Sequence, residues 1–418
     1  MKFSKNFIVF IQLAGYTLVS SGALCQNTTS PYSIYGIGDI DKQLYNRTNG
    51  IGSTGMAIRS DNYLINNNPA AISGLPRSFF VLNAAGIGRT VQYSGEGINA
   101  SNDRSRDFWI KGITMAVKVN KFWASSLGFK QFSNVNYKFS GNKDVIGDNE
   151  TYPAEYEGDG GLNDYFWTNA FSIGKHFSVG VKSSIIAGGI NRTETVINST
   201  QSVATKQQDY FGDPEFEYGA IYSGSVNKNW DVSLGGKYIN KTKLNAERTI
   251  TIAEGNTIVV NDQFVKNGIF YLPQTYSGGI SMTHNKKITF AADYTFENWK
   301  PLNISGDGWR LINSNRLSGG IEFSRKAQKW GQTIEKKYFQ LGGFINNSYL
   351  QVNNTPINEF GITAGTGGTL GNNLLYTISI GGGKRGTTNA NLIQENFFQF
   401  SISLTYRDFL FSKGRKYE

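Results

Sequence analysis

Apolar and polar residues alternate along many short segments of this chain. In the last such segment, apolar residues occupy the even positions from Phe398 to Tyr406, and polar residues occupy the odd positions between them. Further segments of this kind cover residues 288–297 and 215–222. A period of two over about ten residues predicts a β-strand long enough to cross a bilayer when tilted. An apolar face opposite a polar face is typical of a barrel wall between lipid and a polar lumen.

The same pattern predicts about fourteen antiparallel strands. We expect them at residues 78–88, 106–119, 122–138, 164–175, 177–195, 214–226, 231–245, 268–283, 287–298, 314–325, 337–350, 355–367, 373–385 and 396–411. No run of about 18 apolar residues follows residue 25, so membrane-spanning helices are not expected. The 49 glycines and the 14% aromatic content suit an all-β transmembrane barrel. A soluble sandwich could share this strand content.

The connections between the predicted strands alternate in length. The short ones cover residues 119–121, 174–176, 227–229 and 285–287, and the long ones cover 89–105, 139–163, 196–213, 246–267 and 299–313. Short periplasmic turns that alternate with long external loops are typical of bacterial barrels, whereas a soluble sandwich has no reason to sort its loops by length. The connection at 326–336 is an exception, because it is long where a short turn is expected.

Basic residues collect at the predicted periplasmic ends. The chain has 41 basic and 31 acidic residues, and lysines occupy each short turn, at Lys121, Lys175, Lys228, Lys286 and Lys287. They form no nucleic-acid-binding motif, so no nucleic-acid partner is expected. Contact with phospholipid headgroups and a merely solvated rim are both compatible with this pattern. A periplasmic protein partner is the third interpretation.

The first 25 residues are predicted to be a signal peptide. Lys2 and Lys5 precede an apolar stretch at 7–18, and cleavage is expected before Gln26. Lipidation of Cys25 is disfavoured because Leu24 precedes it, where a small residue is preferred. Cys25 is the single cysteine of the chain, so the mature protein would contain none. The expected location is the Gram-negative outer membrane.

Residues 26–77 are rich in Asn, Gly and Ser and do not alternate like wall strands. A fourteen-stranded barrel has a lumen that wall side chains alone cannot fill. This segment is therefore expected either inside the barrel as a plug or in the periplasm. The predicted organisation is a signal peptide at 1–25, a hatch at 26–77, the barrel at 78–411 and a periplasmic tail at 412–418.

Three stretches of the sequence resemble the FadL-like outer-membrane transporters of hydrophobic compounds, and in particular their Bacteroidetes branch. A glycine-rich stretch at 50–57 precedes Asn68-Pro69-Ala70, which is similar to the hatch motif of that family. The second stretch covers 272–280, with Ala291-Ala292-Asp293-Tyr294 and Trp299 after it, and the third joins Ser30-Pro31-Tyr32-Ser33 to Arg415-Lys416-Tyr417 at the other end. The resemblance implies a fourteen-stranded barrel with an N-terminal hatch, and gating through Asn68, Pro69 and Ala70.

The activity that the resemblance implies is passive uptake of small hydrophobic molecules, fatty-acid-like or aromatic, which rearrangement of the hatch or a kinked wall strand would admit. No ligand-pocket motif of the family is matched, so the ligand-binding residues are unknown. The alternative is an accessory or shuttle subunit of the type IX secretion system, since some barrels of this type serve that machinery. The partners implied are outer-membrane lipid, a hydrophobic ligand and, in the alternative, a secretion-system protein.

The sequence offers little for catalysis. Its two histidines, His176 and His284, both lie at predicted periplasmic turns, and no Gly-x-Ser-x-Gly motif is present. An enzyme, a cofactor and a transition-metal site are therefore not expected. The acidic residues at 144–159 lack the fixed spacing of a Ca²⁺ site and are better explained as a solvated loop. Six tryptophans near strand ends are expected in an interfacial girdle, at Trp109, Trp123, Trp167, Trp230, Trp299 and Trp309.

Overall fold

The computed structural model describes residues 30–77, 79–100, 103–144, 150–197, 201–265, 268–329, 332–370 and 373–409. The predicted signal peptide, Cys25 and the tail at 412–418 lie outside the described residues.

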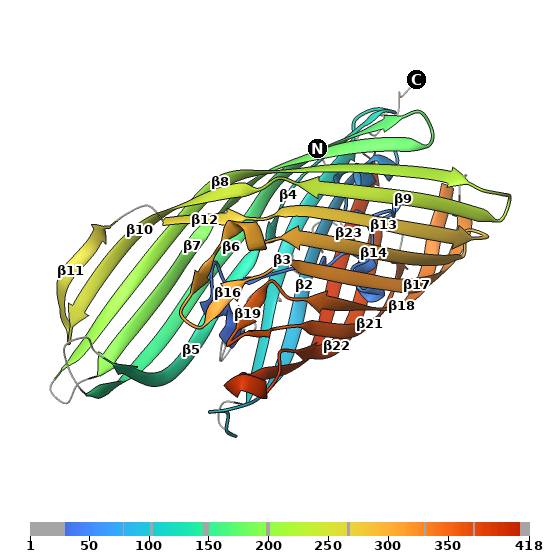
Figure 1. Cartoon of the computed structure of the whole chain (residues 1–418). Coiled ribbons are helices and arrows are strands. Elements are labelled where there is room, and N and C mark those ends of the chain that lie inside the picture. The colour runs from blue at the N-terminus through green and yellow to red at the C-terminus, as the bar shows by residue number, and fades with distance from the viewer. Residues whose placement is uncertain are drawn as a thin grey trace.

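Fourteen antiparallel strands of the described chain form a closed barrel (Figure 1), as the alternation predicts. The strands are β2 (Phe79–Ser94), β3 (Arg104–Lys118), β4 (Trp123–Gln131), β6 (Thr151–Ile173), β7 (Phe177–Ile197), β8 (Ser202–Ser225), β9 (Trp230–Ile239), β13 (Gln274–His284), β14 (Ile288–Asn298), β17 (Ser314–Lys329), β18 (Gln332–Asn347), β21 (Glu359–Leu370), β22 (Leu374–Arg385) and β23 (Gln394–Phe409). The first and last of them close the wall, since Phe79 pairs with Phe409 and Ser94 with Gln394.

Further short elements extend this wall or cross the lumen. Strands β5 (Ser133–Asp144), β10 (Thr242–Glu254) and β12 (Gly268–Leu272) continue β4, β9 and β13, and β11 (Thr257–Phe264) pairs with β10. The remaining elements are β1 (Asp39–Ile40), β15 (Ser305–Gly306), β16 (Trp309–Leu311), β19 (Leu350–Val352), β20 (Thr355–Pro356) and the 3₁₀ helices η1 (Pro31–Ile34), η2 (Arg47–Ile51), η3 (Pro69–Gly74), η4 (Lys300–Leu302) and η5 (Asn389–Asn391). Within the described ranges, no helix is long and apolar enough to cross a membrane.

The predicted short turns are confirmed, but three of the predicted long loops are wrong. Residues 139–163, 196–213 and 246–267 mostly continue the strands β5, β6, β7, β8 and β10, and add β11. Together these strands project as a tall sheet from one side of the barrel, at the left of Figure 1. The pairs in it are largely polar, as at Glu155–Thr195 and Glu157–Thr193, so the apolar alternation that reveals a membrane strand is missing there. The connection at 326–336 is also part of a hairpin, because β17 continues to Lys329 and β18 begins at Gln332.

The predicted faces of the wall strands are confirmed. On β14, Phe290 and Tyr294 are 45% and 49% exposed, whereas Asp293 between them is 7% exposed. On β8, Tyr218 is exposed and Glu217 is buried. The aromatic face therefore points outward and the charged face lines the lumen.

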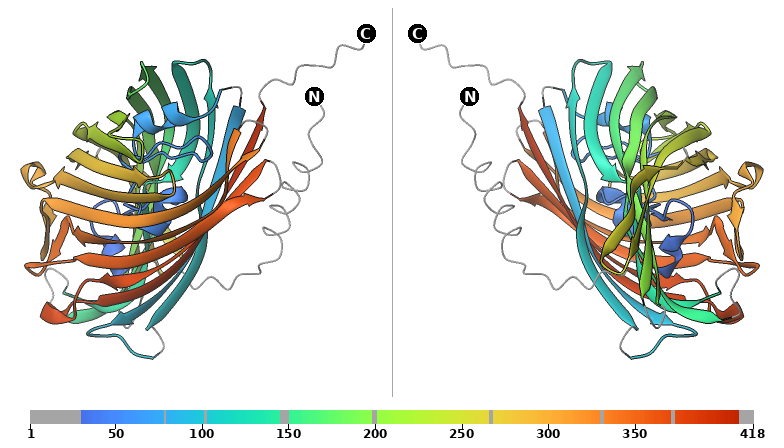
Figure 2. Two further views of the ribbon diagram at one scale, coloured as in Figure 1. Left: turned by 90° about the vertical axis from the view of Figure 1, so that its right-hand side faces the viewer. Right: turned by 90° about the vertical axis from the view of Figure 1, so that its left-hand side faces the viewer.

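Residues 30–77, which we call the lumen segment, lie inside the barrel. Figure 2 shows them as the blue chain enclosed by the wall. Helix η2 packs against β17, β18, β21 and β22, and helix η3 packs against β4, β6, β7 and β8 on the opposite side. The segment thus spans the lumen from wall to wall.

Candidate functional site

Asn68 joins the lumen segment to the barrel wall. Its side chain is fully buried and caps helix η3, with Oδ1 accepting a hydrogen bond from the Ala70 amide at 3.0 Å. The Nδ2 group donates to the carbonyl oxygen of Met56 at 3.0 Å. It also donates to the wall carbonyls of Ala220 and Gly236, at 3.2 and 3.1 Å. One amide therefore ties two parts of the lumen segment to β8 and β9.

Glycines in the wall make room for this motif. A Cβ atom on Gly180 would lie 2.4 Å from the backbone of Pro69, and one on Gly219 would lie 2.0 Å from the side chain of Asn68. Asn68, Pro69 and Ala70 thus sit together directly on the backbones of β7 and β8. The motif can be recognised from the sequence alone, but these two glycines cannot, because they lie more than 100 residues away along the chain.

Arg47 forms a second anchor on the far side of the lumen. Its guanidinium donates to Glu322 on β17 at 2.6 Å and to Glu335 on β18 at 2.7 Å. The guanidinium also lies between the rings of Tyr63 and Tyr338, at 4.7 and 4.4 Å from their centroids. Because all of these groups are buried, each carboxylate depends on this arginine for much of its charge compensation.

Further ion pairs and hydrogen bonds fix the rest of the segment. Asp293 on β14 accepts from the backbone amides of Gly55 and Met56, at 2.6 and 2.9 Å. Arg385 donates twice to Asp39, at 2.7 and 2.9 Å. Burial alone would raise the pKa of Asp39, but Arg385, together with the nearby cations Arg89 and Lys111, outweighs burial and holds that pKa below its ordinary value.

The wall has a gap beside the N-terminal end of the lumen segment. Strands β3 and β4 pair only from Gly112–Lys130 to Lys118–Ala124. A bulge in β3 skips Lys111, and the wall strand breaks at Phe132, between β4 and β5. Among the described pairings, none joins residues 104–111 of β3 to β5. The backbone hydrogen bonds between neighbouring wall strands are therefore interrupted there.

The lumen segment occupies this interruption. Strand β1 pairs with β5 at Asp39–Asn134 and Ile40–Ser133. The Asp41 amide donates to the Phe132 carbonyl at 2.9 Å. At residues 132–134, the start of this wall segment, backbone groups that would face β3 in an intact wall are thus bonded by residues 39–41 instead.

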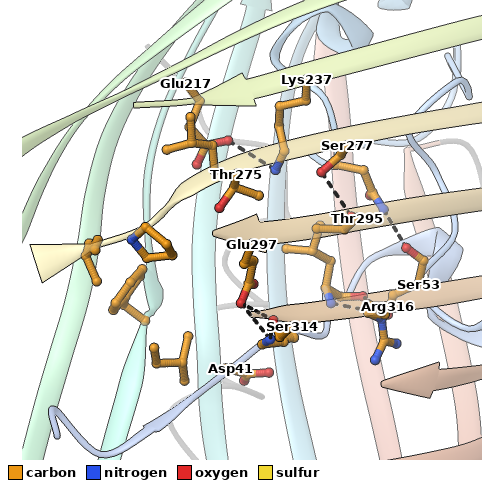
Figure 3. Close-up of a pocket in the computed structure, with 18 of the residues that line it drawn as sticks. Asp41, Ser53, Glu217, Lys237, Thr275, Ser277, Thr295, Glu297, Ser314 and Arg316 are labelled. Carbon is orange, nitrogen blue, oxygen red and sulfur yellow. Dashed lines mark hydrogen bonds and ion pairs between the residues drawn. The ribbon is translucent and has the colours of Figure 1, made fainter. Parts of the chain in front are cut away.

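Behind β1 lies a cavity of about 180 Å³ (Figure 3). Its lining is mixed. The polar part includes the ion pair Lys237–Glu217 at 3.3 Å and the hydrogen bond from Thr295 to Ser277 at 2.9 Å. Leu272 and Trp299 contribute to the apolar part. Glu297 accepts from Lys42 at 2.8 Å on another side of it. A cavity of this size with several polar partners has room for ordered water.

Comparison with known proteins places the chain in a family. Residues 4–418 match the family model described as BamG. The chain belongs to the BamG family. The search of curated proteins returns no match.

Solved structures share the fold of this BamG-family barrel. A FadL homologue of Pseudomonas aeruginosa aligns with a TM-score of 0.60 at 13% identity, over 90% of this chain and 100% of its own. The Pseudomonas putida toluene transporter TodX aligns with a TM-score of 0.55 at 13% identity, over 89% and 99%. The Ralstonia pickettii toluene transporter TbuX gives 0.54 at 12% identity, over 88% and 98%. The FadL-type fold implied by the sequence is therefore confirmed, while membership of a Bacteroidetes branch stays a prediction.

The half of the lumen opposite the short turns contains an apolar cluster rich in aromatic rings. Trp299 is 1% exposed and stacks on Tyr349 at a centroid distance of 5.0 Å. Trp309 contacts Tyr35 of the lumen segment at 5.4 Å. The girdle expected for Trp299 and Trp309 is wrong, because loops fold them inward. The girdle is also wrong for Trp109, whose indole donates to Gln131 across the gap at 2.9 Å.

Within the described ranges, no group of three or more His, Cys, Asp or Glu side chains could hold a metal ion. His176 and His284 lie at the short turns, where the sequence placed them.

Proposed function

We propose that this chain is an outer-membrane channel for passive uptake of small hydrophobic molecules, fatty-acid-like or aromatic, and that residues 30–77 are its hatch. The proposal includes export through a cleaved signal peptide. The main observation behind this proposal is the gap between β3 and β5, where the two wall strands do not pair and strand β1 pairs with β5 instead. Displacing residues 39–41 would open the wall sideways to the bilayer.

The distribution of polarity favours this sideways route. A hydrophobic molecule would enter through the external apolar cluster around Trp299 and Tyr349. Between that cluster and the short turns, many of the side chains that line the lumen are charged. There the anchors at Arg47 and Asn68 hold the lumen segment against the wall and block the path. Moving each CH₂ group from water to an apolar phase gains about 0.8 kcal/mol, so a lateral exit into lipid is downhill whereas a path through the charged lumen is not.

The structural neighbours support the substrate class. TodX and TbuX are described as toluene transporters, and they share this fold across nearly the whole chain. At 12–13% identity the likeness concerns the fold alone, so the substrate rests on the gap and the apolar cluster together with that resemblance.

A disulfide across the proposed gate tests this function. Ile40 and Ser133 are direct antiparallel partners, whose Cα atoms lie about 4.5–5.5 Å apart, within the range that a disulfide spans. The variant Ile40→Cys/Ser133→Cys should take up radiolabelled toluene into intact cells when reduced and stop when oxidised. Reductant should restore uptake.

A matched disulfide controls for oxidation itself. The variant Ser223→Cys/Ser233→Cys joins two wall strands that are already paired and does not touch the lumen segment. Its uptake should be the same in both redox states. Uptake that continues through the oxidised Ile40–Ser133 variant would show that residues 39–41 are no gate.

The tall external sheet favours a second candidate, an accessory barrel that acts through a protein partner, such as a subunit of the type IX secretion system. The edge strand β11 pairs only with β10 among the described strands and exposes Ile258 and Val259 at 59% and 62%. Free apolar edges of this kind accept strands from other chains. The variant Ile258→Lys/Val259→Lys should impair secretion but leave toluene uptake unchanged under this candidate, and should leave both unchanged under the first.

A further inference from the structure

The lipid-facing side of the wall carries a trough that the proposed channel does not use. Its floor is a row of small residues on adjacent strands, in which Ala220 pairs with Gly236 and Gly236 pairs with Gly278. Tyr294 on β14 ends this row at one side. The trough measures about 590 Å³ and opens on the outer surface of β8, β9, β13 and β14.

A row of aromatic rings closes the trough on its external side. Tyr218 pairs with Tyr238, Tyr238 with Tyr276, and Tyr276 with Phe296. The centroids of the tyrosine rings lie 6.5 and 5.2 Å apart along the row. On the periplasmic side the residues next to the floor are Leu234 on β9 and Ile280 on β13. Tyr222 on β8, which pairs with Leu234, is the aromatic ring next to the floor on this side.

Nothing in the packing of the wall requires the glycines of the floor. A Cβ atom on Gly236 would find its nearest neighbour at 3.9 Å, and one on Gly278 at 4.0 Å. Neither residue has a positive φ angle. Glycine weakens a strand interior, so two open glycines side by side indicate space kept free for something outside the chain.

The trough lies at the depth that acyl chains from the periplasmic leaflet reach. Gly236 is six residues above Trp230, the first residue of β9, which is roughly 20 Å along a strand and about 15 Å along the normal at a tilt near 40°. That is about half of a hydrocarbon core roughly 30 Å thick. The external side is closed by rings, so a chain enters from the periplasmic side.

Basic side chains stand where the headgroup of such a lipid would lie. The turns that end β9 and β13 touch each other, since the Asn285 amide donates to the Asn229 carbonyl at 2.7 Å. They carry Lys228, Lys286 and Lys287, all of them exposed. Three ammonium groups on adjoining turns attract an anionic phosphate.

We propose that this trough binds one acyl chain of an anionic phospholipid from the periplasmic leaflet, with its phosphate held by Lys228, Lys286 and Lys287. The size of the site selects a lipid over a protein. A volume of about 590 Å³ lies in the range of small-ligand pockets, about 300–1,000 Å³. Only eleven residues line the trough, whereas a stable protein interface uses roughly 20–30 on each side.

Native mass spectrometry of the delipidated full-length barrel tests this site. The probes are dioleoyl phosphatidylglycerol and dioleoyl phosphatidylcholine at equal concentration. The wild type should retain one phosphatidylglycerol, and Gly236→Leu/Gly278→Leu, which fills the floor, should lower this retention at least about tenfold. Lys228→Gln/Lys286→Gln/Lys287→Gln should keep a lipid adduct but lose most of an about tenfold preference for phosphatidylglycerol.

A leucine on the opposite wall is the matched control. Gly88 also faces outward between Phe108 and Phe400, and a Cβ there has its nearest neighbour at 3.7 Å. Gly88→Leu should bind phosphatidylglycerol like the wild type. Tyr276→Ala removes one of the aromatic rings that close the trough and leaves the floor unfilled. It should weaken lipid binding, and it provides a second test if the double leucine variant folds poorly.

Three results would overturn the proposal. Unchanged retention in folded Gly236→Leu/Gly278→Leu would mean that lipid binds elsewhere or that a protein fills the trough. Equal loss in Gly88→Leu would mean that the adduct is ordinary annular lipid. An unchanged lipid preference in the triple glutamine variant would show that the three lysines do not bind the phosphate.

Discussion

Asn68→Ala should loosen the lumen segment without harming the wall. The substitution removes the donor to the Met56, Ala220 and Gly236 carbonyls and the cap on the Ala70 amide. Loss of an N-cap costs about 0.5–2 kcal/mol, and each further hydrogen bond contributes about 0.5–1.5 kcal/mol. The cap and the Met56 bond lie within the lumen segment, so only the bonds to Ala220 and Gly236 join it to the wall. We therefore expect the bound position of the segment to lose about 1–3 kcal/mol relative to a displaced one, which multiplies the displaced population roughly 5- to 150-fold.

Single-channel recording in planar bilayers measures this population as the frequency of opening events. Asn83→Ala is the matched control, because Asn83 is also a buried asparagine, yet its amide donates to Ser403 and Thr405 of the wall, both at 2.8 Å. The control should open as rarely as the wild type. If the two alanine variants open equally often, Asn68 does not hold the segment in place and the motif has no part in gating.

Three further predictions concern the plug, the wall and its orientation. Deleting residues 30–70 while keeping the predicted signal should leave an assembled barrel with high conductance to small ions, and a conductance equal to that of the intact protein would contradict the plug. Tyr294→Arg, on the lipid face, should cost about 2–4 kcal/mol in urea titrations of barrels refolded into vesicles, while Thr295→Arg, beside the lumen cavity, should cost less; equal costs would invert the faces. A cysteine replacing Glu155 should react with an impermeant maleimide on intact cells and one replacing Lys286 should not, since Glu155 lies near the start of β6 and Lys286 in the short turn between β13 and β14. The reverse pattern would show that the predicted topology is inverted.

The wall could be predicted because a strand between lipid and a polar lumen must alternate in polarity. The alternation located all fourteen wall strands and the outward faces of Phe290 and Tyr294. It failed above the membrane, where β6, β7 and β8 have water-exposed polar pairs and no apolar face to reveal them. The prediction for Trp299 was also wrong. A tryptophan at a strand end is expected at the membrane interface, but that expectation does not consider how the next loop folds.

The interior could not be predicted in the same way. Arg47 contacts Glu322 and Glu335, which lie 275 and 288 residues away along the chain, and no local sequence pattern predicts such partners. The position of Asn68 came from a resemblance rather than from periodicity. Even so, its partners Gly180 and Gly219 emerged only once β7 and β8 were placed against it.

The chemistry of the contacts between the lumen segment and the wall bears on how a plug can be both ordered and movable. Along much of this interface the contacts are polar, as at Arg47–Glu322, Asp39–Arg385, Lys42–Glu297 and Lys111–Asp41. Buried ion pairs gain little over apolar packing because desolvation offsets their attraction, but a wrongly placed partner leaves a charge bare at high cost. Such ion pairs therefore strongly favour one position of the lumen segment over others, while stabilising that position only moderately. An apolar interface of the same extent would hold the segment as firmly as a protein core, so these polar contacts fit the proposed role of the segment as a displaceable hatch.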